Sequence, residues 1–338
     1  MQDREWHPAL PSFFIFRFAF LIVPIRLIFM GTADLACASL QALAQAPAFQ
    51  VVAVVTQPDR PKGRDLKLQP SSVKALALKL GLRVLQPERA RDEGFIAELR
   101  PLAPDLIIVA AYGQILPQPV LDLPRFGCLN VHTSLLPKYR GAAPIQWALL
   151  NDDAETGVTI MKMDAGLDTG DLLTTRSTAI APADNAQTLH DRLAALGADL
   201  LVRTLPDYIA GKISPRPQPA SGACYARKIA KEDGHLDWTQ PARQLWNRIR
   251  AFTPWPGAFT FQPAEPKPIL LKIWQAEIIE FGGAAAPGEI LRADKQGLLV
   301  RCGRHALNIQ VLQREGSRRL NAAEFLSGHP LQPGDCFK

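Results

Sequence analysis

Two polar residues in an apolar segment are the strongest candidates for chemistry in this chain. Asn130 and His132 stand two positions apart within residues 127–137. Side chains alternate along a strand, so both should point to the same face of a sheet. An amide can donate a hydrogen bond to a developing oxyanion, and an imidazole can move protons. The pair therefore favours group transfer through a tetrahedral intermediate, in which no serine, cysteine or metal ion need take part.

A later loop supplies carboxylates that can orient the imidazole. Asp164, Asp168 and Asp171 lie within residues 163–171, which also contain glycines. A carboxylate beside an imidazole fixes its tautomer and favours its charged form. A lone histidine on a strand is more often structural, but the neighbouring amide and this loop favour a catalytic role. The pattern alone does not choose among the three aspartates.

Residues 56–67 form a third candidate site, because this segment is too long and too polar for an ordinary connection. It carries Arg60, Lys62, Arg64 and Lys67 near the expected active edge. Connections longer than the usual few residues tend to be functional or disordered. We predict phosphate contacts by Arg64 and Lys67, with a mobile surface loop as the alternative.

Residues 31–34 end the first predicted strand, where a nucleotide-binding fold would place its phosphate loop. The segment reads Gly-Thr-Ala-Asp and lacks the Gly-x-Gly-x-x-Gly spacing that lets a backbone approach a pyrophosphate. This argues against an enzyme that depends on NAD or ATP. The turn either lines a pocket or, as we favour, is a plain strand-to-helix turn capped by Asp34.

Strands and helices alternate along the first two thirds of the chain. Continuous apolar runs are typical of parallel strands buried on both faces, and a 3.6-residue period is typical of helices. Strands are expected at residues 27–30, 51–55 and 105–111, and helices at 34–46, 71–80, 92–99 and 186–209. We therefore predict an α/β fold with a doubly wound, mostly parallel, Rossmann-like sheet.

A proline-rich segment separates this first domain from a smaller second one. Residues 211–219 read GKISPRPQP, which should pack neither as helix nor as sheet. The predicted boundaries are 25–210 for a catalytic domain, 211–224 for the linker and 225–338 for the C-terminal domain. Residues 225–252 look mainly helical, and residues 266–313 show the short alternating runs of a small β-barrel.

Charge and cysteine usage indicate the setting of the protein. The 338 residues carry a net charge of +6, and residues 213–338 hold the whole excess, with 17 Lys+Arg against 11 Asp+Glu. Such asymmetry indicates an anionic partner, most often nucleic acid, and the alternative is a solvated basic surface. The five cysteines are scattered without a Cys-x-x-Cys pair, which argues against disulfides and zinc and favours a reducing cytoplasm.

The N-terminus is unusually apolar. Residues 12–30 resemble part of a membrane or export segment, but Arg17, Pro24 and Arg26 interrupt them and no small-residue cleavage site follows. We interpret residues 1–24 as an appended or over-called extension rather than a signal peptide. A membrane tether is the alternative.

Several short motifs occur along the chain in a recognisable order. They are Gln-Pro-Asp-Arg-Pro at 57–61, Asn-Val-His at 130–132, Ser-Leu-Leu-Pro at 134–137, Tyr-Arg-Gly-Ala-Ala-Pro-Ile-Gln at 139–146, and the segments 157–164, 166–171, 225–229 and 249–256. Together they resemble the methionyl-tRNA formyltransferase family over about residues 26–336. All folate-dependent formyltransferases share the Asn-x-His and Asp part, whereas the long basic loop and the C-terminal domain distinguish the tRNA enzymes.

The resemblance assigns roles to individual residues. Asn130, His132 and Asp168 match the catalytic residues of the family, so it selects one aspartate of the three. The tetrahydrofolate-binding segment of the family matches Ser134, Leu135, Leu136 and Pro137.

The resemblance also implies how tRNA is bound. Arg64 matches a residue that engages the tRNA acceptor end, and the C-terminal domain would be an OB-like barrel that grips the acceptor arm. Ala33 stands where the family usually has proline, and Thr133 where glycine is frequent. Neither departure removes a functional group.

The resemblance implies transfer of a formyl group from 10-formyltetrahydrofolate to the α-amine of methionine on initiator tRNA. It further implies binding of tRNA and folate. We also expect a cytoplasmic monomer with no metal, no membrane and no stable protein partner. Three alternatives stay open: a folate-dependent formyltransferase for an amino sugar or purine precursor, a non-catalytic tRNA-binding homologue and, more distantly, a nicotinamide oxidoreductase.

Overall fold

The structure is a computed structural model that describes residues 24–62 and 67–338. The predicted N-terminal extension lies outside these residues except for Pro24. Within the described part of the chain, no helix is both long and apolar enough to cross a membrane.

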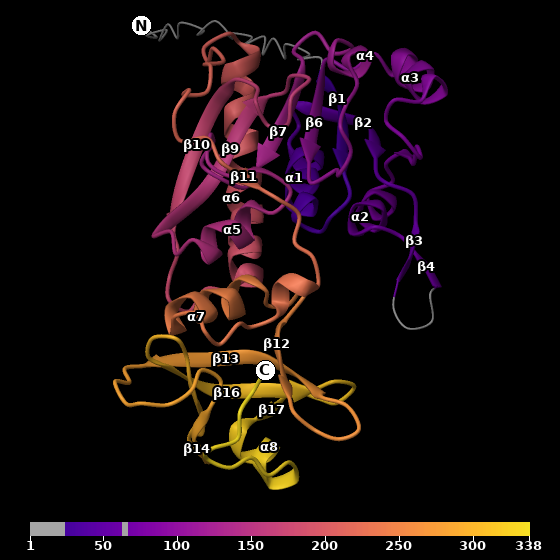
Figure 1. The fold of residues 1–338 in the computed structure, drawn as a ribbon. Helices are drawn as coiled ribbons and strands as arrows, with labels where there is room; N and C mark the ends of the chain where they lie inside the picture. The colour runs from indigo at the N-terminus through magenta and orange to yellow at the C-terminus, as the bar shows by residue number, and fades with distance from the viewer. Residues whose placement is uncertain (1–23, 63–66) are drawn as a thin grey trace, which may run out of the picture.

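The first domain is built on a seven-stranded sheet with the order β10-β9-β7-β6-β1-β2-β5 (Figure 1). Its strands are β1 (Ile25–Gly31), β2 (Phe49–Val55), β5 (Val84–Leu85), β6 (Leu106–Ala110), β7 (Cys128–His132), β9 (Glu155–Lys162) and β10 (Leu172–Ala179). The five strands from β7 to β5 are parallel, and β9 and β10 add antiparallel to the β7 edge. The predicted mostly parallel sheet is therefore confirmed.

Helices cover both faces of this sheet, which explains the continuous apolar strands. In β1, Leu27 and Phe29 enter one core, and Ile28 and Met30 enter the other. The first core also holds residues of α1 (Leu35–Gln45), α2 (Ser72–Lys79), α5 (Pro144–Leu150) and α6 (Ala186–Ile209), and the second holds residues of α3 (Glu93–Leu99) and α4 (Gln118–Leu121). Parallel strands buried on both faces need apolar side chains at every position.

The C-terminal domain is an antiparallel sheet with its own core. Its strands are β12 (Ala258–Gln262), β13 (Ile269–Ile279), β14 (Ile290–Asp294), β15 (Gly297–Arg301), β16 (Ala306–Arg314) and β17 (Leu320–Asn321), followed by α8 (Ala322–Gly328). They pair in the order β12-β13-β16-β15-β14, with β17 on β16. This sheet is compatible with the OB-like barrel, and closure of the barrel stays a prediction.

The expectation that residues 225–252 are mainly helical is wrong. Only α7 (Ala242–Ala251) and a short 3-10 turn, η2 (Glu232–Gly234), are helical there. Pro241 is the N-cap of α7, because proline lacks the N–H that an interior position needs. Upstream, β11 (Tyr225–Ala226) pairs in parallel with β8 (Arg140–Gly141) of the first domain.

The proline-rich linker also packs more closely than its composition predicts. Arg216 forms an antiparallel bridge with Leu172, with N···O distances of 2.7 and 2.9 Å. The prolines on either side of Arg216 do not prevent this, because the bridge uses only the N–H and carbonyl of Arg216 itself. The expectation that this segment cannot pack as sheet is therefore wrong at Arg216, and the domain boundaries stay a prediction.

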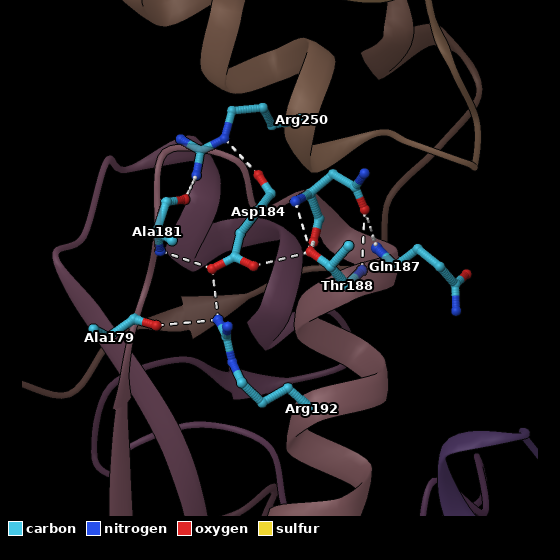
Figure 2. Close-up of polar contacts among 8 residues, drawn as sticks. Ala179, Ala181, Asp184, Gln187, Thr188, Arg192 and Arg250 are labelled. Atoms are coloured by element: carbon cyan, nitrogen blue, oxygen red, sulfur yellow. Dashed lines mark hydrogen bonds and ion pairs between the residues drawn. The ribbon is translucent and has the colours of Figure 1, made fainter.

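Helix α7 connects the two domains. It packs between α5 of the first domain and β13 of the second (Figure 1). Arg250 on α7 donates to the carbonyls of Ala181 and Asp184 at 2.9 and 2.6 Å (Figure 2). Arg243 on the same helix forms a two-pronged ion pair with Asp152. Side chains of α7 thus hold the second domain against the first, together with the pairing of β11 with β8.

Candidate active site

Strand β7 carries the two residues with which the sequence argument began. Asn130 and His132 lie at its carboxyl-terminal end, and they are only 9% and 6% exposed. The Asn130 amide donates to Oδ1 of Asp168 at 3.3 Å, and Nδ1 of His132 lies 3.7 Å from Oδ2 of the same carboxylate. The predicted common face is therefore confirmed.

The three candidate aspartates differ in what they contact. Asp164 closes its own turn, accepting from the Gly166 N–H at 3.0 Å and the Thr169 hydroxyl at 2.7 Å. Asp168 instead faces β7, and its Oδ2 accepts from the Gly141 N–H at 2.8 Å. Asp171 accepts from the Lys162 N–H through its main-chain carbonyl. Geometry thus brings Asp168 to Asn130 and His132, as the resemblance implies.

The tautomer of His132 is set by a group that the sequence argument missed. Nε2 of His132 lies 2.9 Å from the carbonyl oxygen of Tyr139. A carbonyl can only accept, so Nε2 carries a hydrogen and Nδ1 of the neutral ring has a free lone pair. Our expectation that Asp168 holds the tautomer is corrected: Tyr139 does so, and Asp168 faces the nitrogen that can take up a proton.

The predicted folate-binding segment follows β7 directly. The Ser134 hydroxyl donates to the Lys138 carbonyl at 2.6 Å, and the Ser134 carbonyl accepts from the Thr159 hydroxyl at 2.7 Å. Ser134 and Leu136 are buried, whereas Leu135 and Pro137 are partly exposed. Ser134 and Leu136 therefore stiffen the segment, and Leu135 and Pro137 present its accessible surface. The folate-binding role of all four residues stays a prediction.

The predicted basic loop contains a short hairpin. Strand β3 (Arg60–Lys62) pairs antiparallel with β4 (Lys67–Gln69). Arg64 lies outside the described residues, and only the backbone of Lys67 is described. This pairing was not predicted, because the composition of the segment is that of a polar loop.

A cavity of about 510 Å³ opens beside this hairpin. It is lined by the turn at Thr32, Ala33 and Asp34, by Gln57, Pro58, Arg60, Gln69, Ser71 and Ser72, and by Ala111, Tyr112 and Gly113. Asp34 also caps α1 by accepting from the Leu35 N–H at 3.1 Å. The turn therefore has both of the roles that the sequence left open: it lines the cavity, and its Asp34 caps α1.

Hydrogen-bonding groups from outside the predicted set complete the site. Gly141 holds the Asp168 carboxylate, and Gln218 of the linker donates to the main-chain carbonyl of Asp168 at 2.8 Å. The motif at 139–146 signalled the first of these, whereas nothing in the sequence pattern signalled Gln218. Among the residues described, no group of three or more His, Cys, Asp or Glu could hold a metal ion.

Family models match both domains of this chain. Residues 25–205 match the formyl transferase model, and residues 228–330 match the model of the formyl transferase C-terminal domain. A methionyl-tRNA formyltransferase from Geobacter sulfurreducens is 51% identical over 310 residues, 92% of this chain and 96% of the relative. The chain belongs to the methionyl-tRNA formyltransferase family. Another family member, from Caldanaerobacter subterraneus, is 50% identical over 93% of this chain and its own full length.

Solved structures of other formyltransferases share the fold of this family member. HypX from Aquifex aeolicus in complex with tetrahydrofolic acid superposes with a TM-score of 0.57 at 17% identity, over 93% of this chain and 50% of HypX. An N-formyltransferase from Helicobacter canadensis, bound to folinic acid and dTDP-3-aminofucose, gives a TM-score of 0.61 at 20% identity, over 86% of this chain and 99% of that one. At these identities the likeness concerns the fold alone.

Proposed function

We propose that this chain transfers the formyl group of 10-formyltetrahydrofolate to the α-amine of methionine esterified to initiator tRNA. The observation that supports the chemistry is that Asn130 and His132 reach the two oxygens of one carboxylate, that of Asp168. The identity of about 50% to methionyl-tRNA formyltransferases, over both domains, supports the substrates.

The reaction begins when the amine nitrogen attacks the formyl carbon and the carbonyl oxygen gains negative charge. One N–H of the Asn130 amide is engaged by Asp168, which leaves the second free to donate to that oxygen. Removing one such donor typically costs about 2.7–4 kcal/mol of barrier height. Asn130 therefore stabilises the tetrahedral intermediate.

Proton transfer completes the exchange of bonds. His132 takes the proton from the attacking amine on Nδ1, and the imidazolium then lies against the Asp168 carboxylate, 3.7 Å away. The intermediate collapses when the bond from carbon to the folate N10 breaks and His132 returns the proton to N10. Holding two reactants together supplies much of the acceleration, because their relative motion is already restricted.

Substrate binding divides between two regions. Ser134, Leu135, Leu136 and Pro137 are proposed to form part of the folate site beside β7. The cavity next to the β3–β4 hairpin is proposed to receive the aminoacylated end of the tRNA, with Arg64 and Lys67 contacting phosphates. The basic C-terminal domain then contacts the acceptor arm. We further propose that the protein acts as a cytoplasmic monomer.

A formyl-transfer assay tests this function. Purified protein is mixed with 10-formyltetrahydrofolate and methionyl initiator tRNA, and the mass of the aminoacyl group is followed after hydrolysis. We expect the mass of one formyl group to appear on methionine from charged tRNA, and none on free methionine or uncharged tRNA. Transfer to a nucleotide-linked amino sugar but not to tRNA would support the alternative acceptor instead.

A further inference from the structure

One linker side chain uses all of its hydrogen-bonding capacity beside the active site. Nε2 of Gln218 donates to the main-chain carbonyls of Asp168 and Gly170 at 2.8 and 2.9 Å. Its Oε1 accepts from Nε and Nη2 of Arg140 at 3.1 and 2.7 Å. An amide has two N–H donors and two acceptor lone pairs, so this side chain is saturated. It joins the linker, the Asp168 loop and β8.

The backbone of Asp168 has a conformation that such contacts stabilise. Its φ is +53°, in the left-handed region that few non-glycine residues adopt, although aspartate enters it more often than most. Residues in sparsely populated backbone regions persist only where the surroundings hold them. Gln218 holds the carbonyl of this residue, while the Gly141 N–H holds its carboxylate. The linker thus holds the backbone of Asp168, and β8 holds its side chain. Gln218 connects these two segments, because it also contacts Arg140 of β8.

The linker itself is fixed on either side of Gln218. Two residues upstream, Arg216 pairs with Leu172 at the start of β10. Downstream, β11 pairs with β8, where Gly141 has a φ of +111° and a Cβ would lie 2.8 Å from the Ala226 carbonyl oxygen. Gln218 is therefore presented to the Asp168 loop by a stretch of chain anchored at both ends.

We propose that Gln218 is a positioning residue for formyl transfer: it holds the Asp168 loop so that the carboxylate stays aligned with His132 and Asn130. The linker between the domains is then part of the catalytic machinery's support rather than a spacer. This inference rests on the proposed function, since turnover is read as formyl transfer.

Replacing Gln218 by alanine should lower kcat and leave KM for both substrates within about twofold. The donors and cations that contact substrate are untouched, but the carboxylate loses the contact that aligns its backbone. A misplacement of about 1 Å at a catalytic group can cost about 100-fold in rate, so we expect a fall of about 10- to 100-fold.

A second variant distinguishes the role of the N–H donors of Gln218 from that of its acceptor oxygen. Gln218→Glu keeps oxygen acceptors for Arg140 and loses both N–H donors to the carbonyls of Asp168 and Gly170. If those donors position Asp168, this variant should lose at least as much kcat as Gln218→Ala. Gln187→Ala is the matched control, because Gln187 donates to Asp191 at 2.8 Å on the exposed start of α6, away from the Asp168 loop.

The experiment measures kcat, both KM values and amide hydrogen exchange of residues 164–171 in all four proteins. We expect faster exchange in this loop for both Gln218 variants than for Gln187→Ala, with Tm values that keep every variant folded at the assay temperature. Exchange and kcat equal to those of Gln187→Ala in either Gln218 variant would overturn the inference. A wild-type protein that transfers no formyl group would instead refute the proposed function, and loop exchange would still test the positioning role.

Discussion

Two aspartates near the ends of β10 form networks of opposite kinds. Asp184, between β10 and α6, accepts from Arg192 at 2.5 Å, from the Ala181 N–H at 2.7 Å and from the Thr188 hydroxyl at 3.0 Å (Figure 2). Asp168, before β10, has one short contact, at 2.8 Å to the Gly141 N–H. Its contacts with Asn130 and His132 are long, at 3.3 and 3.7 Å.

The difference separates a structural carboxylate from a candidate catalytic one. Burial raises the pKa of Asp184, but hydrogen bonds from Arg192, Ala181 and Thr188 outweigh it and lower that pKa below its usual value. Asp184 is therefore ionised, and its three hydrogen bonds are all 3.0 Å or shorter. The long contacts of Asp168 can still tighten when His132 gains a proton, as catalytic hydrogen bonds often do in the presence of substrate. The carboxylate with the longer contacts is therefore the catalytic candidate.

Replacing Asp168 should have the largest effect. Asp168→Asn keeps the shape of the side chain but removes the charge that faces His132. We expect kcat for formyl transfer to fall at least about 100-fold. The Tm should change little, because only one short contact is altered. Steady-state kinetics and thermal unfolding of the same preparation check this, and retained turnover would show that the carboxylate is not needed.

Replacing Asp184 should lower stability and leave turnover nearly unchanged. Asp184→Ala leaves Arg192 without its carboxylate partner and frees the turn that Arg250 contacts, so we expect a loss of about 1–3 kcal/mol in the free energy of unfolding. Turnover below the melting range should stay within a few-fold of wild type. Denaturant unfolding measures the change. Asp199→Ala is the control, because Asp199 pairs at the exposed surface with Arg176 and Arg203 and its loss should alter stability little.

A third substitution should affect neither carboxylate network. Arg64→Ala removes a cation from the basic segment proposed to contact the tRNA acceptor end. We expect KM for charged tRNA to rise about tenfold, the equivalent of about 1.4 kcal/mol, with folate binding and Tm unchanged. Kinetics with each substrate varied in turn provide the test. Equal loss of folate binding would mean that Arg64 serves the whole site rather than the tRNA.

The smallest expected effect is the pH dependence of Asp184. Its pKa is lowered in the folded state, so its contribution to stability is complete above the unfolded value of about 3.9 and is lost as pH falls through the folded value. The difference in unfolding free energy between wild type and Asp184→Asn should therefore shrink between pH 5 and pH 2. Urea unfolding of both proteins across that range is the measurement. A difference that grows toward low pH would contradict the sign of the shift.

Local patterns were enough to predict most of the first domain. The helix expected at residues 186–209 has those bounds in α6. The helix expected at residues 71–80 is α2, which Ser71 caps through a 3.0 Å bond from the Lys74 N–H. Alternation along β7 predicted that Asn130 and His132 share a face. Each of these depends on residues close together in sequence, for which hydrophobic period and capping chemistry are direct signals.

Most of the missed features join distant segments, and the local β3–β4 hairpin is the exception. Three missed features connect residues 216–226 to residues 140–172: the pairing of β11 with β8, the bridge from Arg216 to Leu172 and the contacts of Gln218. Each uses backbone groups on at least one side, and every residue carries those groups whatever its type. The Tyr139 carbonyl on His132 escaped prediction for the same reason. The chemistry could be predicted from side chains, but the support of the site could not.

The most direct test of the account is the single-turnover rate of formyl transfer with Asn130→Ala, at saturating 10-formyltetrahydrofolate and methionyl initiator tRNA. The account predicts a rate about 10²–10³-fold below wild type. The dissociation constants of both substrates should stay within about twofold, because this amide acts on the transition state. A single-turnover rate equal to that of wild type, with both substrates bound, would contradict the central claim that β7 and Asp168 form the catalytic centre.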